Sequence, residues 1–220
     1  MSDAEKVSPE GHEAEEGCED ELHQPQNLAT LRALYEERGD EEEVRARLAG
    51  GLFRTLCKGR AAKDEELRRT RVDEIRTLAY THPADEAIRA FLAMGLYNCV
   101  IDAQQEEDKG ARDAFLDDLR TLAAKFPDDE TIRRHRAMGL LNAATYAAEE
   151  DARDRRDAIL DELRALAKAT PGDESVLWCV GNALLHAAAD HESQGDVAGR
   201  DALRAEVEGM VQASPPAPEA

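Results

Sequence analysis

The chain has 220 residues, of which 42% are apolar and 4% aromatic, and its formal net charge is −20 at pH 7. The apolar fraction excludes disorder throughout the chain, and the scarcity of aromatic residues disfavours a β-sandwich. The acidic charge disfavours binding to nucleic acid or to anionic membranes, because phosphate contacts require a basic surface. Arg outnumbers Lys 22 to 6, so two origins of the charge stay open: adaptation to a saline environment, or a basic partner.

The two ends of the chain differ in composition from its middle. Residues 1–26 carry nine acids against one Lys and have no helical periodicity, which predicts a disordered acidic tail. Residues 214–220 contain three prolines and are predicted to form a second disordered tail. The absence of an apolar signal region and of a run long enough to span a bilayer predicts a cytoplasmic protein. Residues 27–213 are the predicted helical repeat domain.

The middle of the chain repeats itself with a period of 44 residues. Four windows that start at Leu31, Ile75, Leu119 and Leu163 align without gaps, and the second and third agree at 21 of 44 positions. A fixed period between 20 and 50 residues indicates stacked supersecondary units.

Each window predicts a pair of helices. Pro83, Pro127 and Pro171 end one helix, and the Asp that follows each proline by two residues is a good start for the next. From Ile88 the apolar residues follow helical spacing over four turns, and a break near residues 108–110 precedes a second helix. The pattern predicts a helix of about 20 residues and a helix of about 16 in each unit, paired as antiparallel hairpins that stack on one another.

The phrases "AMGLYN" and "AMGLLN" place Gly95 and Gly139 at equivalent positions. Gly51 and Ala183 complete this column of small residues, which predicts a close approach of two helix backbones.

These residues resemble a tetratricopeptide-type helical repeat protein. The resemblance is carried by the three helix-ending prolines and by the Met94-Gly95 and Met138-Gly139 pairs. A period near 44 and Val-Arg-like pairs such as Ile88-Arg89 are similar to HEAT-type repeats. Either resemblance implies an all-α fold, a right-handed α-solenoid of four 44-residue helix-hairpin repeats, and a non-catalytic scaffold that binds proteins or peptides.

Two columns of polar residues are candidates for such a binding groove. Arg45, Arg89 and Arg133 recur near the start of each first helix, where they could hold carboxylates of a peptide or form ion pairs with neighbouring acids. Asn98, Asn142 and His186, with Arg54 as their first-repeat equivalent, could bind a peptide backbone or hydrogen-bond within the fold.

The third repeat departs from the others. His135 and Arg136 replace Phe91 and Leu92 on the apolar stripe, and Trp178 is the only tryptophan. Together with Asn142 and Tyr146, these residues either form a specific pocket or reach solvent from a shallow stripe.

No constellation of residues predicts catalysis, a metal or a cofactor. The cysteines are scattered without a Cys-x-x-Cys pair, and His186 and Asp190 are too few ligands for a metal. The predicted function is therefore binding of a protein or peptide by a monomer or homodimer. The alternatives are a self-associating structural protein and, as the weakest, an enzyme with a pocket in the third repeat.

Overall fold

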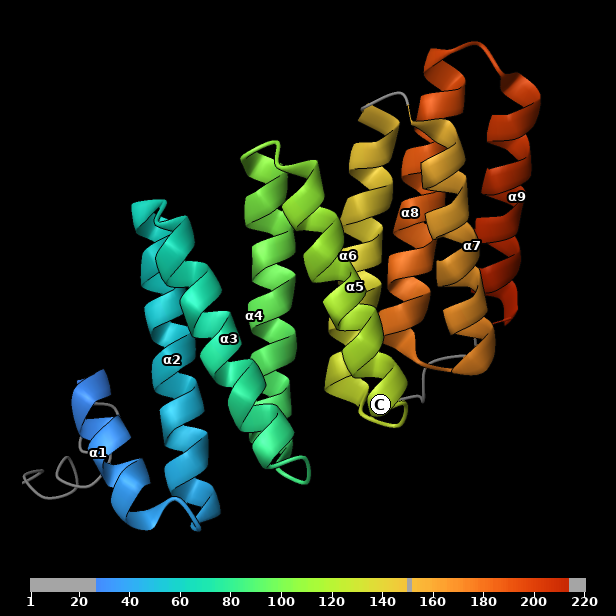
Figure 1. Ribbon diagram of the computed structural model, residues 1–220. Helices are drawn as coiled ribbons and strands as arrows, with labels where there is room; N and C mark the ends of the chain where they lie inside the picture. The colour runs from blue at the N-terminus through green and yellow to red at the C-terminus, as the bar shows by residue number, and fades with distance from the viewer. Residues whose placement is uncertain (1–26, 150–151, 214–220) are drawn as a thin grey trace, which may run out of the picture.

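The computed structural model describes residues 27–149 and 152–213, and all of their regular structure is helical (Figure 1). The helices are α1 (Leu28–Arg38), α2 (Glu42–Ala62), α3 (Glu65–Thr81), α4 (Glu86–Gln105), α5 (Lys109–Lys125), α6 (Glu130–Glu149), α7 (Arg153–Ala169), α8 (Glu174–Ser193) and α9 (Val197–Ala213). These residues contain no strand, which confirms the all-α fold class. The two predicted tails, 1–26 and 214–220, lie outside the described residues.

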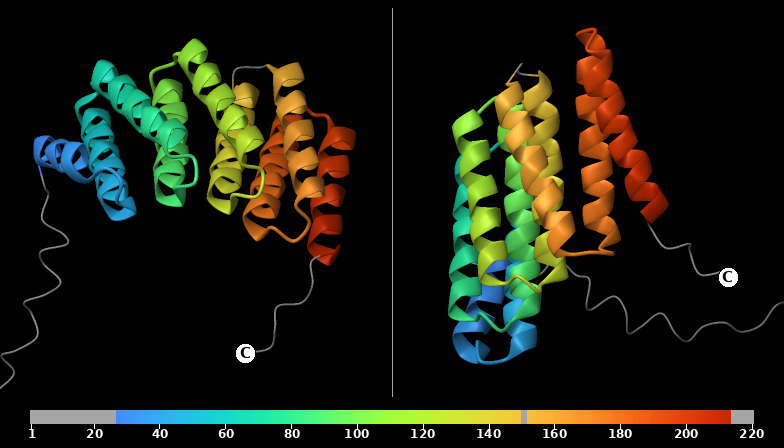
Figure 2. Two further views of the ribbon diagram at one scale, coloured as in Figure 1. Left: turned by 60° about the horizontal axis from the view of Figure 1, so that its bottom comes forward. Right: turned by 90° about the vertical axis from the view of Figure 1, so that its right-hand side faces the viewer.

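The helices form two rows. We call α2, α4, α6 and α8 the inner row, because each packs directly on the next, and we call α1, α3, α5, α7 and α9 the outer row. The backbones of the outer helices do not touch one another among the described residues; each packs only on inner helices. Closer spacing in one row than in the other bends the array, and the left view of Figure 2 shows the inner row on the inside of an arch.

Local sequence accounts for the turns between helices. Asp85, Asp129 and Asp173 cap the inner helices by accepting hydrogen bonds from the backbone N–H three residues later. The residue before each proline has almost the same backbone conformation in all three hairpins, with φ of −124°, −130° and −127° and ψ of 65°, 68° and 65°. Because a residue before proline avoids the helical region, the outer helix ends there each time.

The core lies between the rows, and the column of small residues faces it. A Cβ atom added at Gly139 would lie 3.2 Å from Leu119 and 3.3 Å from Leu116 of α5, and one at Gly95 would lie 3.4 Å from Leu56. Leucine side chains thus occupy the space that these glycines leave. The prediction that two helix backbones approach each other at this column was wrong in this detail, because a missing side chain can be filled by a neighbour's side chain.

The last outer helix covers one side of the final inner helix. Leu203, Val207 and Met210 of α9 pack against the apolar core. The amphipathic pattern of α9 is therefore used within the chain, as expected for a helix with one apolar stripe.

Candidate functional site

The three predicted groove arginines join consecutive inner helices at their N-terminal ends. The Nε atom of each donates to the capping Asp of the next inner helix: Arg45 to Asp85 at 3.1 Å, Arg89 to Asp129 at 3.0 Å, and Arg133 to Asp173 at 2.7 Å. We call these pairs the Arg–Asp ladder. Leu177 stands at the equivalent position of α8 and ends it.

In the Arg–Asp ladder, both the arginine and the aspartate form further hydrogen bonds besides the one that joins them. Arg89 also donates from Nη1 to the backbone oxygen of Pro83 at 2.6 Å. The Arg89 side chain is largely buried, so its bonds to Pro83 and to Asp129 are both shielded from water. Burial alone would raise the pKa of Asp173, but the hydrogen bonds from Arg133 and the backbone outweigh it and hold that pKa below its usual value. The structure therefore uses these arginines as joints between hairpins, the ion-pair alternative of the two considered from sequence.

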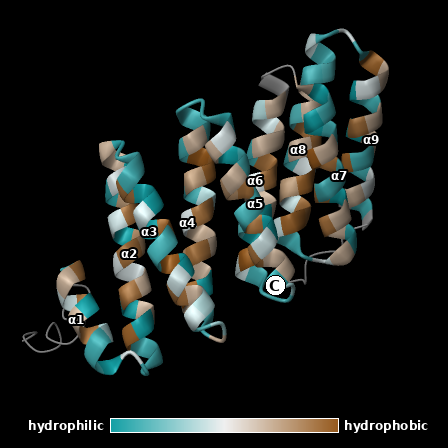
Figure 3. Ribbon diagram, viewed as in Figure 1, coloured by the Kyte–Doolittle hydropathy of each residue, from teal (hydrophilic) through white to brown (hydrophobic). Residues whose placement is uncertain are grey.

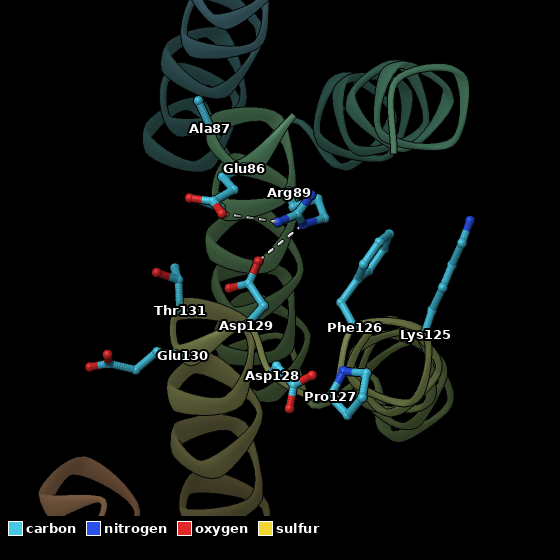
Figure 4. Close-up of a pocket in the computed structure, with 11 residues that line it drawn as sticks. Glu86, Ala87, Arg89, Lys125, Phe126, Pro127, Asp128, Asp129, Glu130 and Thr131 are labelled. Carbon is cyan, nitrogen blue, oxygen red and sulfur yellow. Dashed lines mark hydrogen bonds and ion pairs between the residues drawn. The ribbon is translucent and has the colours of Figure 1, made fainter. Parts of the chain in front are cut away.

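A pocket of about 650 Å³ opens beside the ladder between α4 and α6 (Figure 4). Its lining has four carboxylates, those of Glu86, Asp128, Asp129 and Glu130, and two cations, Arg89 and Lys125. Both cations face the ring of Phe126, with Arg89 Cζ at 4.7 Å and Lys125 Nζ at 5.5 Å from its centre. The pocket thus has an aromatic wall and an excess of acids.

A similar pocket of about 690 Å³ lies 44 residues further along the chain. It is lined by Glu130, Asp173, Glu174, Arg133 and Arg134, among others. Its acids again outnumber its bases, and Arg133 pairs with Asp173 while Arg134 pairs with Glu130.

The second predicted column lies on the inner row and is largely without partners. We call Arg54, Asn98, Asn142 and His186 the inner column. Only Asn142 has a hydrogen bond within the described part of the chain, from Nδ2 to the hydroxyl of Tyr97 at 3.4 Å. Arg54 and His186 are exposed and Asn98 is half-buried. Their polar groups remain available to another molecule.

The unusual residues of the third repeat do not come together in one pocket. His135 points toward α4, where its ring packs edge-on against Tyr97 with centroids 5.8 Å apart. Arg136 points toward the outer row and donates to Glu162 of α7 at 2.8 Å. Adjacent residues on a helix point about 100° apart, which separates these two side chains. Trp178 is 60% exposed on α8.

Tyr146 is half-buried at the position that Asp102 and Asp190 hold in the neighbouring hairpins, where each aspartate pairs with an arginine of a buried column. Arg68, Arg112 and Arg156 are each almost fully buried between an inner and an outer helix. Arg68 donates to Glu106 at 2.7 Å, and Arg156 forms an ion pair with Asp190. The sequence analysis missed this column, although the 44-residue spacing of its arginines was a visible signal.

The sequence analysis also missed an arginine column along the outer row. Arg32, Arg76, Arg120 and Arg164 each pair with an acid of the next outer helix, at 2.6, 2.6, 2.6 and 2.7 Å. The acids are Glu74, Asp118, Glu162 and Glu206, and we call these pairs the outer ladder. Burial alone would raise the pKa of Glu162, but hydrogen bonds from Arg120 and Arg136 outweigh it and lower that pKa. The spacing of these residues was again a visible signal.

The residues of the possible metal pair are engaged elsewhere. Asp190 pairs with Arg156, and His191 Nδ1 lies 2.8 Å from Asp196. Within residues 27–149 and 152–213, no three His, Cys, Asp or Glu side chains form a group that could hold a metal ion.

The cysteines in the core behave as apolar residues. Burial raises the pKa of the Cys99 thiol to about 12 and that of Cys179 to about 11, so both are protonated at neutral pH. Cys18 lies outside the described residues.

No helix in the described part of the chain combines the length and the apolar character needed to cross a bilayer. Hydrophilic residues interrupt the hydrophobic ones along each helix (Figure 3).

No protein-family model, curated protein or solved structure gave a significant match to the chain. The resemblance to tetratricopeptide-type or HEAT-type repeats therefore stays a prediction based on the residues that carry it.

Proposed function

We propose that the chain is an α-solenoid of four 44-residue helix hairpins and serves as a non-catalytic scaffold that binds a protein or peptide segment along its inner row. The inner column carries this proposal. It offers one polar side chain per hairpin, and three of the four have no partner among the described residues. A half-buried amide such as Asn98 is more stable when hydrogen-bonded, so a bound backbone would supply what the fold does not.

The spacing of the inner column suits an extended peptide. Packed helices lie about 8–10 Å apart, and an extended chain advances about 3.3 Å per residue. Successive members of the column would therefore meet about every third residue of the peptide, where Asn98 and Asn142 can bond its amide groups.

The acidic pockets favour a segment that carries Lys or Arg. Both pockets open at the N-terminal ends of inner helices and contain more acids than bases. Glu86 and Asp128 border the first of them. A cationic side chain there would meet these two carboxylates.

A displayed library of random peptides tests this proposal. Peptides selected on the wild-type chain should bind the double variant Asn98→Ala, Asn142→Ala about 10-fold to 30-fold more weakly, since each lost hydrogen bond contributes about 1 kcal/mol. The variant Thr121→Ala, which removes an exposed polar side chain from α5 of the outer row, is the matched control. Selected peptides that bind the double variant and the wild type equally would rule out the inner column as the binding site.

Self-association is a second candidate function, favoured by exposed apolar side chains on α8. The cytoplasmic location stays a prediction.

A further inference from the structure

α8 is the last helix of the inner row. The side of α2, α4 and α6 that packs on the next inner helix has no such helix to pack on at α8 in the part of the chain that the structure describes. On α6, Ala137 is fully buried and Leu141 packs against the core, on the side where α8 lies. The equivalent residues of α8 are Gly181 and Leu185. Leu185 is 48% exposed, and a Cβ atom added at Gly181 would have no atom within 4 Å. Among the described residues, nothing therefore covers the side of α8 that would receive a further inner helix.

This side is more apolar than its counterpart inside the array. Leu177 and Trp178 stand where α6 has Arg133 and Arg134. Of the four large apolar side chains that are exposed in the described residues, Trp178 and Leu185 both lie here. The end of a repeat array that faces water needs a polar outer surface, so these replacements run in the opposite direction from a cap. We call Leu177, Trp178, Gly181 and Leu185 the open face of α8.

We infer that the open face of α8 binds the same face of a second copy of the chain, in an antiparallel helix pair around a two-fold axis beside Gly181. Trp178 precedes this glycine by three residues and Leu185 follows it by four. If the two α8 helices run antiparallel about a two-fold axis at this point, Trp178 of each copy lies against Leu185 of the other. The face is self-complementary, as an isologous interface requires.

The first inner helix does not offer an alternative partner surface. The side of α2 that would receive a preceding helix carries Arg47, which pairs with Glu43 at 2.6 Å. The equivalent residues that face a preceding helix elsewhere are Phe91, His135 and Cys179. Stacking of α8 on α2 of another copy would bury a charged pair, which is unfavourable. The array is therefore expected to close as a dimer and not to extend as a filament.

The pair of α8 helices continues an interface that the fold already uses. The rings of Phe53 and Phe91 join α2 to α4 with centroids 5.7 Å apart, and Tyr97 and His135 join α4 to α6. Leu185 occupies the position of Phe53 and Tyr97 in the last hairpin. In the proposed dimer, the helix that packs on this position would come from the second copy and not from the same chain.

The expected dimer is weak and salt-dependent. One helix face buries less than the roughly 800 Å² per partner of a standard interface, so we expect a Kd on the order of 10 µM. Two chains of net charge −20 repel each other. Added salt screens this repulsion and should strengthen association, whereas a basic peptide on the inner row would bind more weakly in salt.

Sedimentation equilibrium and tryptophan emission of the full chain test this inference together. Trp178 is the only tryptophan, so its emission reports this face alone. Dilution from about 500 µM to about 1 µM, on either side of the expected Kd, should convert dimer to monomer and shift the emission to longer wavelength. A chain that stays monomeric throughout this range overturns the inference.

Two matched pairs of variants locate the interface. Leu185→Lys should abolish the dimer, whereas Val197→Lys, at an equally exposed apolar residue of α9, should not. Gly181→Val should weaken association at least 10-fold, whereas Gly209→Val should not, although an added Cβ meets no atom at either glycine. A dimer that survives both Leu185→Lys and Gly181→Val would place the interface elsewhere and overturn the inference.

A chain that ends at Ala213 tests whether residues 214–220 cover the open face instead. If the C-terminal segment is the cover, Trp178 of the full chain is shielded at every concentration and becomes exposed in the shortened chain. That result also overturns the inference. The inner-row proposal is unaffected by any of these outcomes, because the variants leave Asn98 and Asn142 unchanged.

Discussion

At position 135 a histidine takes the place that Phe91 has in the preceding hairpin and Cys179 has in the next. Burial disfavours the charged imidazole and lowers the pKa of His135; the hydrogen bond to the Thr131 carbonyl acts in the opposite direction, and the charge of Arg134 lowers the pKa further. The folded state thus favours neutral His135 more than the unfolded chain does.

Replacement of this histidine by phenylalanine should reduce the sensitivity of the fold to acid. A lowered folded pKa gives stability that is complete above the unfolded pKa of about 6.5 and is lost as the pH falls through the folded pKa. His135→Phe should therefore lose less free energy of unfolding between about pH 7.5 and about pH 5 than the wild type. Urea unfolding at both pH values measures this difference. The exposed His186→Gln variant is the control, and an unchanged pH dependence in His135→Phe would contradict the assignment.

Individual residues also mark the limit of what the sequence predicts. His135 and Arg136 were visible as polar breaks in an apolar stripe, but the sequence does not tell which neighbouring helix each side chain meets. His135 packs on Tyr97 of α4, and Arg136 pairs with Glu162 of α7, on another side of α6. Such pairings depend on how helices far apart in sequence are placed, so they required the structure.

Among the elements, the joints between inner helices are the clearest case of one residue serving two helices. Asp129 caps α6 by accepting a backbone hydrogen bond at Oδ1, and its Oδ2 accepts the charged hydrogen bond that Nε of Arg89 donates from α4. The capping bond fixes where α6 begins, and the ion pair fixes where that beginning lies against α4.

Loss of a ladder arginine should therefore be more costly than loss of a surface arginine. Arg89→Leu, which copies Leu177, leaves the carboxylate of Asp129 in a nearly buried position without its partner, and we expect a loss of about 2 kcal/mol in unfolding free energy. The exposed Arg134→Leu should cost less than about 0.5 kcal/mol. Denaturant unfolding measures both.

Adding Asp129→Asn to Arg89→Leu should recover part of the loss, because Asn keeps the helix cap and removes the unpaired charge. Equal stabilities of Arg89→Leu and Arg134→Leu would show that the ladder does not hold the helices together.

Most of the helices could be predicted from the sequence. The prolines at 83, 127 and 171 and the aspartates two residues later act within a few residues of themselves, so their effect is readable locally. The sequence did not decide the partner of Arg89, because an arginine can pair equally well with an acid of its own chain or with a carboxylate of a ligand. The outer and buried arginine columns were missed because a charged residue on a helix carries no apolar period that identifies its neighbour.

At the scale of the whole molecule, the outer ladder connects helices whose backbones do not touch. Arg76, Arg120 and Arg164 each reach an acid of the next outer helix. These side chains are partly exposed, so each pair contributes less than about 1 kcal/mol to stability. Their combined effect is on shape, since they oppose the repulsion between acidic outer helices.

A triple variant should test this effect on shape. Arg76→Gln, Arg120→Gln and Arg164→Gln together leave Asp118 and Glu206 without their arginines, and Glu162 keeps only Arg136 of α6. The outer row should therefore spread and the arch should bend further. We expect a shorter maximum dimension in small-angle X-ray scattering, with a smaller difference at about 1 M salt, where charges are screened beyond about 3 Å.

The control triple removes the same charge from pairs within single helices. Arg47, Arg69 and Arg134 pair with Glu43, Glu65 and Glu130 of their own helices. Their replacement by Gln should leave the maximum dimension unchanged. Equal scattering changes in the two triples would mean that net charge, and not the outer ladder, sets the curvature.

The Arg–Asp ladder has a consequence for how such a chain could change in length. Each arginine finds its aspartate 40 residues later, and the pattern recurs every 44. An in-frame tandem duplication of residues 86–129 would supply the new copy with its own Arg89 and Asp129 while leaving every older pair in register. Genetic lengthening by whole units would thus need no compensating mutation at the joints, whereas a deletion or insertion of any other size would break them.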